Sequence, residues 1–405
     1  MPTPFGSSDG RVEMEVDALL GGLREVVGGL GGRRRDVVAV GVAGMAESGA
    51  PLDGGGRPLA RIIAWHDGRG AEEVAVLERR FGDRLAGRAG QAANTKMTVV
   101  KLGWLVAHGL TGMTRWLGVP ELALHALTGV EGTEHSLAAR TGCYDVGAHR
   151  WMPEVAGALG FGTDVFAPVR AAGEAMGRIS VAGAGWSGLP DGVPVTLAGH
   201  DHLAGMAGAG AGPGDLANSV GTAETLVGRT ATLPDLAAAS ANRVAVTVYP
   251  RGAGWAALVG AARAGLVIES AAAALGRSPA ELDRLASEAE PVDVRDVVDA
   301  FAKGDRPALP GAPPGSIWAG LLHALTARTV DGYHRLTEVV GPPGRVVVFG
   351  GGAASRPWLE AKAGALPVPV LRAPVTSAVA RGAAVQAGVA AGWWPSEADA
   401  PPPAG

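Results

Sequence analysis

The first hundred residues alternate between apolar patterns of helical and of extended period. Apolar side chains recur at intervals of three or four residues from Val16 to Leu30, which predicts an amphipathic helix. The β-branched run 36–43 follows and predicts a buried strand. After it come a segment dense in turn residues, 51–58, and a second apolar run, 61–65. Strand, glycine turn and strand in this order predict a β-hairpin.

The second half of the chain alternates more regularly between strands and helices. Residues 194–198 predict a buried strand, and residues 216–225 predict two strands joined by a Gly-Thr turn. Apolar residues then lie on one face of a long helix over 322–340, which the sequence Pro-Pro-Gly ends. The elements expected after this helix are a strand at 345–349, a helix at 356–366, a strand at 368–371 and a helix at 375–391. Strands that alternate with helices predict an α/β fold with mixed or parallel sheets covered by helices.

Composition excludes several classes of protein. The 405 residues include 35 Lys and Arg against 39 Asp and Glu, and this net charge of −4 gives no basic excess that points to nucleic acid or an anionic membrane. Apolar residues make up 47%, enough for a large core, and a lone cysteine, Cys143, excludes an internal disulfide. The N-terminus lacks the basic and apolar regions of a signal peptide, and no charge-free apolar stretch reaches about eighteen residues. The sequence therefore predicts a cytoplasmic protein.

A glycine run follows the strand expected at 345–349. Residues 346–355 read VVVFGGGAAS, so three glycines lie between a buried strand and a helix. Such a turn can bring backbone N–H groups close to an anion or a nucleotide, because no Cβ holds the ligand away. The run lacks the Lys-Ser/Thr of a Walker A loop and the GxGxxG spacing of a dinucleotide-binding turn. The alternative is a tight structural turn in a glycine-rich protein.

The Gly-Thr turn within Ser219–Thr222 is a second candidate phosphate site. Its backbone donors and its hydroxyl could bind phosphate oxygens, although the same sequence is also typical of an ordinary hairpin turn.

The segment Ala198-Gly-His-Asp-His-Leu203 follows the strand expected at 194–198. Asp201 could act there as a general base that takes a proton from a substrate hydroxyl as the hydroxyl attacks phosphorus. The rival interpretation makes His200, Asp201 and His202 metal ligands, but neither an H-E-x-x-H motif nor a cysteine pair supports it. Polar residues in a surface loop are the remaining alternative.

A smaller cluster combines Glu47, after the first strand, with Trp65-His-Asp-Gly-Arg69. A tryptophan face beside carboxylate and guanidinium groups can bind a polyol, with CH bonds on the ring and hydroxyls on the charges. The alternative is a packed tryptophan beside a local ion pair.

In chain order, these segments resemble the FGGY family of carbohydrate kinases, within the actin/hexokinase-like ATPase superfamily. Residues 37–69 resemble the family's sugar-site hairpin, which ends in Trp-x-Asp-x-Arg. Residues 127–151 resemble its interdomain stretch, in which an LTG precedes a T-D/E-x-S-x-A run and a Trp. Residues 198–224 resemble the catalytic Asp segment and the second phosphate loop. The C-terminal nucleotide-domain blocks are matched by 327–336, 346–366 and 380–392, so the resemblance covers about residues 10 to 392.

The resemblance implies transfer of the ATP γ-phosphoryl group to a sugar or polyol hydroxyl, with Mg²⁺, by two actin-like lobes that close on a cleft. Asp201 would be the general base, and no residue is assigned as a metal ligand. The residues implied at or near the sugar are Glu47, Trp65, Asp67 and His200. The residues implied at ATP are Gly221 and Thr222 on the phosphates, and Gly350, Gly351, Gly352 and Ala353 on the adenosine side.

The resemblance also implies a division of the chain and a set of partners. A sugar-binding lobe is expected over 1–212, a nucleotide-binding lobe over 213–395 and a disordered tail over 396–405. The partners implied are a small sugar or polyol and ATP, without nucleic acid or membrane, and a homodimer is one option for the assembly.

The sequence departs from the family at its start and at the sugar site. The N-terminal Asp-x-Gly-Thr phosphate hairpin of the family is absent, so the first lobe is expected to be incomplete at its start. Either the start codon is placed too late, which the retained Asp201 and triple glycine favour, or the chain is a degenerate relative. Glu47 stands where pentulose-kinase-like members carry His, and Ala46 where glycerol-kinase-like members carry Arg. The Gly-His-Asp sequence resembles deoxysugar kinases such as fuculokinases.

Two other functions compete with a kinase. A pseudokinase would bind a sugar or nucleotide and act as a sensor or regulatory protein, and the absent first phosphate loop is the feature that favours it. An NAD(P)-dependent enzyme would rest on the glycine-rich turns alone, without the dinucleotide fingerprint and its acidic ribose partner.

Overall fold

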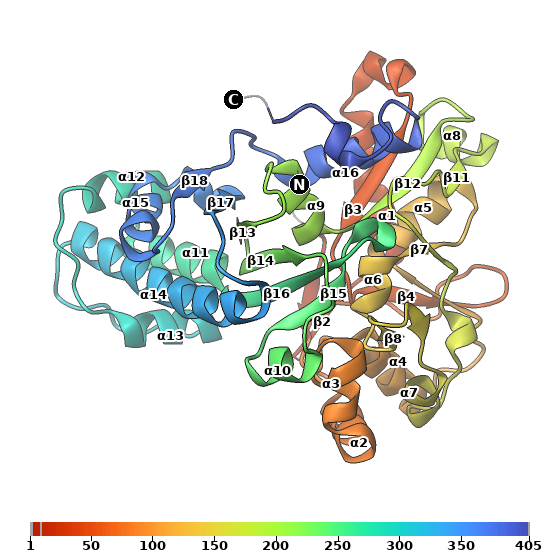
Figure 1. Ribbon diagram of the computed structural model, residues 1–405, viewed down its shortest axis with the longest axis horizontal. Coiled ribbons are helices and arrows are strands. Elements are labelled where there is room, and N and C mark those ends of the chain that lie inside the picture. Colours follow the sequence, from red (N-terminus) through yellow and green to blue (C-terminus); the bar gives the residue numbers. More distant parts are fainter. Residues whose placement is uncertain (1–2, 9, 404–405) are drawn as a thin grey trace.

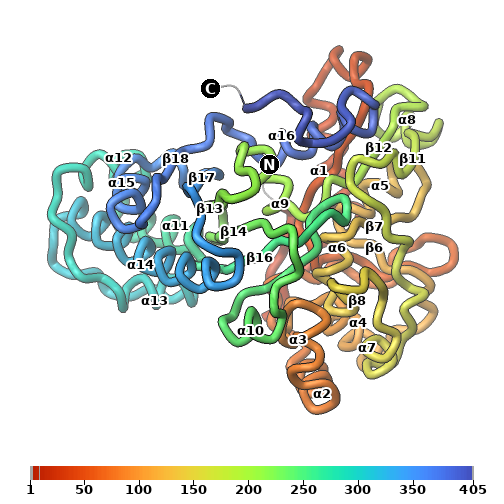
Figure 2. The backbone as a smooth tube through the Cα atoms, viewed as in Figure 1, coloured from red at the N-terminus to blue at the C-terminus, as the bar shows by residue number. Residues whose placement is uncertain are grey.

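Two lobes lie side by side in the computed structural model of the protein, which describes residues 3–8 and 10–403 (Figure 1). The first half of the chain forms the lobe on the right, and most of the second half forms the lobe on the left (Figure 2). Helices α9 (Asp201–Gly208) and α16 (Ala378–Ala390) pack against each other between them. This arrangement confirms the predicted two-lobed α/β fold.

The sheet of the first lobe is built around β12 (Pro194–His200), whose residues are all buried. Strand β12 pairs in parallel with β3 (Val40–Gly44) and antiparallel with β11 (Gly177–Arg178). Helix α5 (Val119–Thr128) packs on this sheet, and so does α16 from the C-terminal part of the chain. Gly41 of β3 contacts the Ala383 carbonyl so closely that a Cβ would collide with it. Helix α16 thus belongs by packing to the first lobe as well as to the second.

The remaining elements of the first lobe surround this sheet. Its other strands are β1 (Gly6–Ser8), β2 (Arg11–Met14), β4 (Gly49–Leu52), β5 (Ile62–Ile63), β6 (Arg115–Gly118), β7 (Thr133–Glu134), β8 (Tyr144–Asp145), β9 (Arg150–Trp151) and β10 (Val169–Arg170). Its other α-helices are α1 (Val16–Gly28), α2 (Ala71–Phe81), α3 (Asp83–Ala89), α4 (Thr98–Ala107), α6 (His135–Ala139), α7 (Pro153–Ala158) and α8 (Val181–Ser187).

The hairpin predicted from residues 36–43 and 61–65 is wrong. The chain does turn back between β4 and Pro58, where Asp53 accepts hydrogen bonds from the Gly55 and Arg57 amides. However, β3 pairs with β12, β4 with β6, and β5 with β2. Turn residues specify a local reversal, but burial against distant strands decides which strands pair.

The second lobe contains a sheet with the strand order β15-β16-β14-β13-β17-β18. Its strands are β13 (Asp215–Val220), β14 (Glu224–Thr230), β15 (Ala245–Val248), β16 (Trp255–Ala262), β17 (Arg345–Phe349) and β18 (Val370–Arg372). The helices gathered around it are α10 (Leu236–Ala241), α11 (Ala264–Leu275), α12 (Pro279–Ala286), α13 (Arg295–Lys303), α14 (Pro314–Val340) and α15 (Arg356–Ala365). One face of the sheet packs with α11 to α15, and the opposite face packs with α9 and α16. Both faces are therefore covered, as strands rich in Val and Leu require.

Most elements predicted in the second half are confirmed, and so is the first helix, which forms α1. The strands near 194–198, 216–225, 345–349 and 368–371 form β12, β13 with β14, β17 and β18. The helices near 322–340, 356–366 and 375–391 form α14, α15 and α16. No helix in residues 3–8 and 10–403 is long and apolar enough to cross a bilayer.

The tail that was expected to be disordered over 396–405 makes several contacts within its described part, residues 396–403. Residues Glu397–Asp399 form a 3-10 turn, and the Glu397 carboxylate pairs with Arg229 at 3.1 Å and accepts a hydrogen bond from Gln386 at 2.8 Å. These contacts hold the tail against β14 and α16. Residues 404 and 405 lie outside the described residues.

A buried ion pair joins the second lobe's sheet to helix α15. Glu224, at the start of β14, accepts a short hydrogen bond from the Lys362 ammonium, and both side chains are almost fully buried. Thr329 of α14 donates to Glu224 at 2.8 Å and accepts from Lys362 at 2.9 Å. The sequence pattern gave no sign of this pair, because the partners are 138 residues apart.

We expect Lys362→Met to lower the free energy of unfolding by about 3–5 kcal/mol, because it leaves the Glu224 carboxylate buried and unpaired. Urea unfolding followed by tryptophan fluorescence measures the change, since Trp358 lies 4.9 Å from the Lys362 ammonium. Lys303→Met, at an exposed position at the end of α13, is the matched control. Equal stability of the two variants would contradict the structural role of the pair.

Candidate active site

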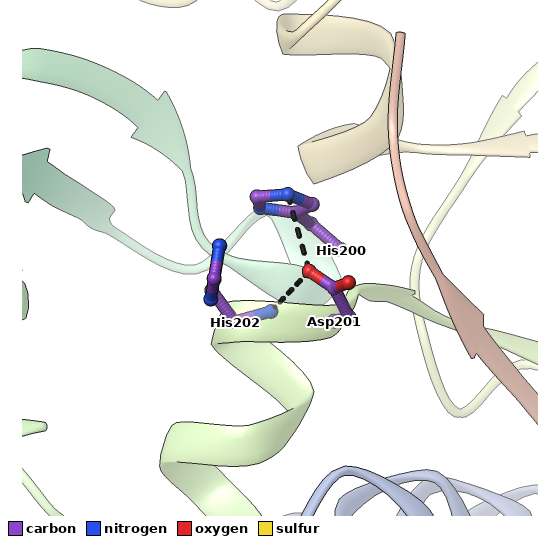
Figure 3. A group of neighbouring side chains, drawn as sticks. All are labelled: His200, Asp201 and His202. Carbon is purple, nitrogen blue, oxygen red and sulfur yellow. Dashed lines mark hydrogen bonds and ion pairs between the residues drawn. The ribbon is translucent and has the colours of Figure 1, made fainter. Parts of the chain in front are cut away.

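Asp201 lies at the junction between β12 and α9, where the strand ends at His200 and Asp201 begins the helix. One carboxylate oxygen, Oδ1, accepts a hydrogen bond of 2.7 Å from the His202 amide and lies 3.3 Å from Nε2 of His200 (Figure 3). The other oxygen, Oδ2, has no hydrogen-bond or ion-pair partner among the described residues, and the side chain is 36% exposed. The Asp201 carboxylate is therefore held in place through Oδ1, while Oδ2 is free to contact a ligand.

The charges around Asp201 keep its carboxylate ionised at neutral pH. Burial would raise the pKa of Asp201, but the imidazoles of His202 and His200 and the His202 amide hold it below its ordinary value. Burial lowers the pKa of His200 to about 4, so this imidazole is neutral at pH 7. A carboxylate with a low pKa beside a neutral imidazole can accept a proton from a bound hydroxyl.

The His200, Asp201 and His202 side chains also place their ligand atoms within 4.8 Å of one another. The structure thus brings together the same three side chains that the metal interpretation of this segment named. Two imidazoles and one carboxylate suit zinc-like ions, however, whereas Mg²⁺ prefers oxygen ligands and keeps several waters. These three side chains therefore do not fit an Mg²⁺ ion that arrives with ATP.

Glu47 follows β3 and faces the same junction. Its carboxylate accepts a hydrogen bond of 2.7 Å from Nε of Arg140, the residue that ends α6. Burial opposes ionisation of Glu47, but the charge and the hydrogen bond of the Arg140 guanidinium hold its pKa below the ordinary value. The backbone of Glu47 has a φ of 62°, an uncommon conformation for a residue with a side chain. The structure thus brings Glu47, His200 and Asp201 together, with Arg140 as an additional charged group.

Trp65 lies beside two lysines that the sequence did not single out. The Lys96 ammonium lies 5.3 Å from the centre of a Trp65 ring, and Nζ of Lys101 donates to the Trp65 carbonyl at 3.5 Å. Lys101 is fully buried, and this burial lowers its pKa to about 8. The charge of Lys101 also reaches Glu47 and lowers the pKa of its carboxyl. Lys101 thus connects the backbone of Trp65 with the electrostatic surroundings of Glu47.

Asp67 has a different environment from the other predicted sugar-site residues. Its Oδ2 accepts hydrogen bonds of 2.7 Å from both the Val12 amide and the Arg69 guanidinium, and its Oδ1 accepts one of 2.8 Å from Arg69. The residue is 2% exposed. These contacts match the alternative of a local ion pair, and they engage both carboxylate oxygens of Asp67.

The two glycine-rich turns meet at one edge of the second lobe's sheet. Strands β13 and β17 are parallel, with Ser219 opposite Phe349, so Gly221–Thr222 and Gly350–Ala353 follow neighbouring strand ends. Gly350 has a φ of +99°, and a Cβ there would lie 2.6 Å from the Val220 carbonyl oxygen. A Cβ on Gly351 would meet no atom within 4 Å. This edge therefore leaves backbone open to a ligand such as the phosphates and ribose of a nucleotide.

Helix α11 adds a further cation near the Gly-Thr turn. The Gly265 amide donates to the Thr222 carbonyl at 3.1 Å, and Arg263 precedes this helix. The charge of Arg263 lowers the pKa values of both His66 and Lys96 in the first lobe, where burial is the larger cause in each case. Sequence reasoning missed Arg263, Lys96 and Arg140, because each becomes part of the site only when distant segments fold together.

Comparisons with known proteins identify the family of the chain. Residues 6–208 match the N-terminal domain of the FGGY family of carbohydrate kinases, and residues 229–391 match its C-terminal domain. An L-fuculokinase from Haemophilus influenzae is 30% identical over 200 residues, which are 48% of this chain and 42% of the relative. The chain thus spans about two fifths of the fuculokinases that it matches. A xylulose kinase from Streptomyces rubiginosus is 28% identical over 369 residues, 85% of this chain and 72% of the relative.

Solved structures share the two-lobed fold. The crystal structure of a xylulose kinase from Rhodospirillum rubrum superposes with a TM-score of 0.80 and 22% identity, over 99% of this chain and 87% of that one. The crystal structure of Plasmodium falciparum glycerol kinase with ADP has a TM-score of 0.81 and 16% identity, over 97% and 84%. At these identities the superpositions establish the fold. Because both family domains are matched in order over most of its length, the chain belongs to the FGGY family of carbohydrate kinases.

Proposed function

We propose that this protein transfers the γ-phosphoryl group of ATP to a hydroxyl of a sugar or polyol. The observation that carries the proposal is Asp201, whose carboxylate is ionised, oriented through Oδ1 and open through Oδ2 at the junction between β12 and α9. Support comes from membership of the FGGY family and from relatives described as sugar and polyol kinases.

Asp201 is proposed as the general base. Its free Oδ2 accepts the proton of the acceptor hydroxyl while the hydroxyl oxygen forms a bond to the γ-phosphorus and the bond to ADP breaks. Glu47 and His200 are proposed to bind acceptor hydroxyls, and Trp65 to pack against the CH face of the acceptor. Mg²⁺, when bound with ATP, neutralises charge on the phosphate oxygens.

The two glycine-rich turns are proposed as the nucleotide site. Gly221 and Thr222 hold phosphate oxygens, and Gly350, Gly351, Gly352 and Ala353 line the adenosine side. The proposal assigns residues 1–212 to the sugar-binding lobe and residues 213–395 to the nucleotide-binding lobe, with a cytoplasmic location where ATP is available. Closure of the lobes would exclude water, which otherwise competes as the acceptor.

Acceptor-dependent release of ADP tests the proposed function. The chain is incubated with Mg-ATP and a panel of pentuloses, hexuloses, deoxysugars and polyols, with deoxysugars first because L-fuculokinases are among its relatives. We expect one acceptor class to stimulate ADP release well above the rate with water alone. Binding of ATP or an acceptor without ADP release in any mixture would contradict the kinase and favour a sensor protein.

We expect Asp201→Asn to reduce phosphoryl transfer by about 10²–10⁴-fold, because an amide cannot accept the hydroxyl proton. Acceptor binding, measured by calorimetry, remains close to that of the unchanged protein. Asp191→Asn, at an exposed position before β12, is the control and retains full activity. Normal turnover by Asp201→Asn would overturn the general-base assignment.

We expect Arg140→Met to make acceptor binding sensitive to acid. Arg140 holds the pKa of Glu47 below its ordinary value, so its removal raises that pKa, and the carboxylate becomes protonated at a higher pH. The KM for the acceptor then rises as the pH falls from 8 towards 5, whereas it stays nearly flat in the unchanged protein. Arg277→Met, which removes an exposed i,i+4 pair with Glu281, is the control. Parallel KM profiles for both variants would exclude Glu47 from acceptor binding.

We expect Gly351→Ala to raise the KM for ATP about tenfold, because the new methyl group points into open space where the nucleotide is proposed to lie. The KM for the acceptor and the melting temperature stay unchanged. Gly364→Ala in α15, where a Cβ also meets no atom within 4 Å, serves as the control. An unchanged KM for ATP would contradict the proposal that the nucleotide binds at this turn.

A further inference from the structure

A chain of buried hydrogen bonds runs from helix α6 to the backbone that carries Asp201. The carboxylate oxygen Oε2 of Glu134 accepts hydrogen bonds from the amide and the hydroxyl of Ser136, at 2.9 and 2.5 Å. The Ser136 hydroxyl oxygen accepts a hydrogen bond of 2.9 Å from the His200 amide. Glu134 and Ser136 are fully buried. The Glu134 carboxylate is thus linked, through the Ser136 hydroxyl, to the His200 amide, one residue before the proposed base Asp201.

The contact between this chain of hydrogen bonds and β12 is too close to accommodate a side chain. Gly199 has a φ of +89°, and a Cβ there would lie 2.6 Å from the Ser136 hydroxyl oxygen and 2.7 Å from Oε2 of Glu134. The register between β12 and β3 also shifts between Leu197 and Gly199, so regular strand pairing is interrupted at this point. Where the ladder is irregular, the Ser136 hydroxyl supplies the partner for the His200 amide.

We propose that Glu134 and Ser136 are positioning residues for Asp201, and that loss of the proton from Glu134 strengthens their hold on the His200 amide. An ionised carboxylate is a stronger acceptor than a protonated one, and it fixes the Ser136 hydroxyl so that the oxygen lone pairs face His200. This inference rests on the proposed kinase function. It differs from the general-base assignment, because neither residue contacts the acceptor.

The surroundings of Glu134 place its ionisation near neutral pH. Burial raises its pKa to about 7, although the Ser136 hydroxyl and amide oppose this, and the charge of Glu121 on α5 adds to the rise. The other groups that face it are Ser136 and the Leu137 amide on α6, the peptide of Gly199 and His200 on β12, and the phenol of Tyr144 on β8, whose pKa is raised. The second carboxylate oxygen, Oε1, has no partner among the described residues.

The test compares pH profiles of kcat for the full chain and three variants between pH 5.5 and 9. In the unchanged protein we expect kcat to rise with pH through about 7, as Glu134 loses its proton. Glu134→Gln and Ser136→Ala lose this rise, and their kcat at pH 8 falls about tenfold with little change in the KM for ATP, the loss expected from one hydrogen bond. Glu121→Gln keeps the rise of kcat but moves it to lower pH, since this buried carboxylate accepts from Thr133 and its charge adds to the raised pKa of Glu134.

Melting temperature measured against pH confirms that each variant folds and tests the ionisation directly. The folded pKa of Glu134 lies above its unfolded value, so the folded state retains a proton that the unfolded chain has lost. Its contribution to stability is therefore fully present below about pH 4.5 and is lost as the pH rises through about 7. We expect this loss in the unchanged protein and not in Glu134→Gln.

Two results would overturn the inference, and they are distinguishable from failure of the proposed function. An active, folded Glu134→Gln variant that keeps the rise of kcat through pH 7 excludes the role of Glu134. A folded Ser136→Ala variant with unchanged kcat excludes the connection to His200. If the unchanged protein releases no ADP with any acceptor at any pH, the proposed function itself fails.

Discussion

The parallel pairing of β3 with β12 is the constraint on which the proposed site depends. Gly44 lies opposite His200 in this pairing, so the segment that carries Glu47 and the junction that carries Asp201 follow neighbouring strand ends at one edge of the sheet. Parallel strands place their carboxyl ends together, and polar residues that follow them meet there at little cost in buried peptide groups. Helix α16 packs directly against β3, where Gly41 contacts the Ala383 carbonyl.

The second lobe applies the same geometry to the two glycine-rich turns. Strands β13 and β17 are parallel neighbours, so the Gly-Thr turn and the triple glycine lie against each other although about 130 residues separate their strands. Beneath them, Glu224 and Lys362 join β14 to α15, so the helix that follows the triple glycine is tied to the strand that follows the Gly-Thr turn. A buried pair of this kind specifies one arrangement, because each charge is costly without its partner.

Burial and charge act in opposite directions on the acidic groups near the junction. The pKa values of Asp201 and Glu47 lie below their ordinary values, because hydrogen bonds and the Arg140 charge favour the ionised form, whereas burial raises the pKa of Glu134 to about 7. The two carboxylates proposed to contact substrate, Asp201 and Glu47, therefore lose their protons at a lower pH than Glu134, which supports the backbone at His200. Residue type alone does not reveal this difference, since all three are acidic residues in short polar segments.

The local pattern of apolar, polar and turn residues was enough to predict several strands, a helix and a turn. The apolar runs of β12, β13 and β17, the amphipathic face of α14 and the glycines after β17 predicted strands, helix and turn, because period and turn chemistry are properties of neighbouring residues. The order of the motifs indicated the kinase family and named Glu47, Trp65, His200 and Asp201. The tertiary structure alone decided the partner of β3, the contacts of the tail, and the surroundings of Arg140 and Glu134. Each of these depends on contacts or solvent exposure created when distant segments pack together, and no local pattern encodes the free energy of such burial.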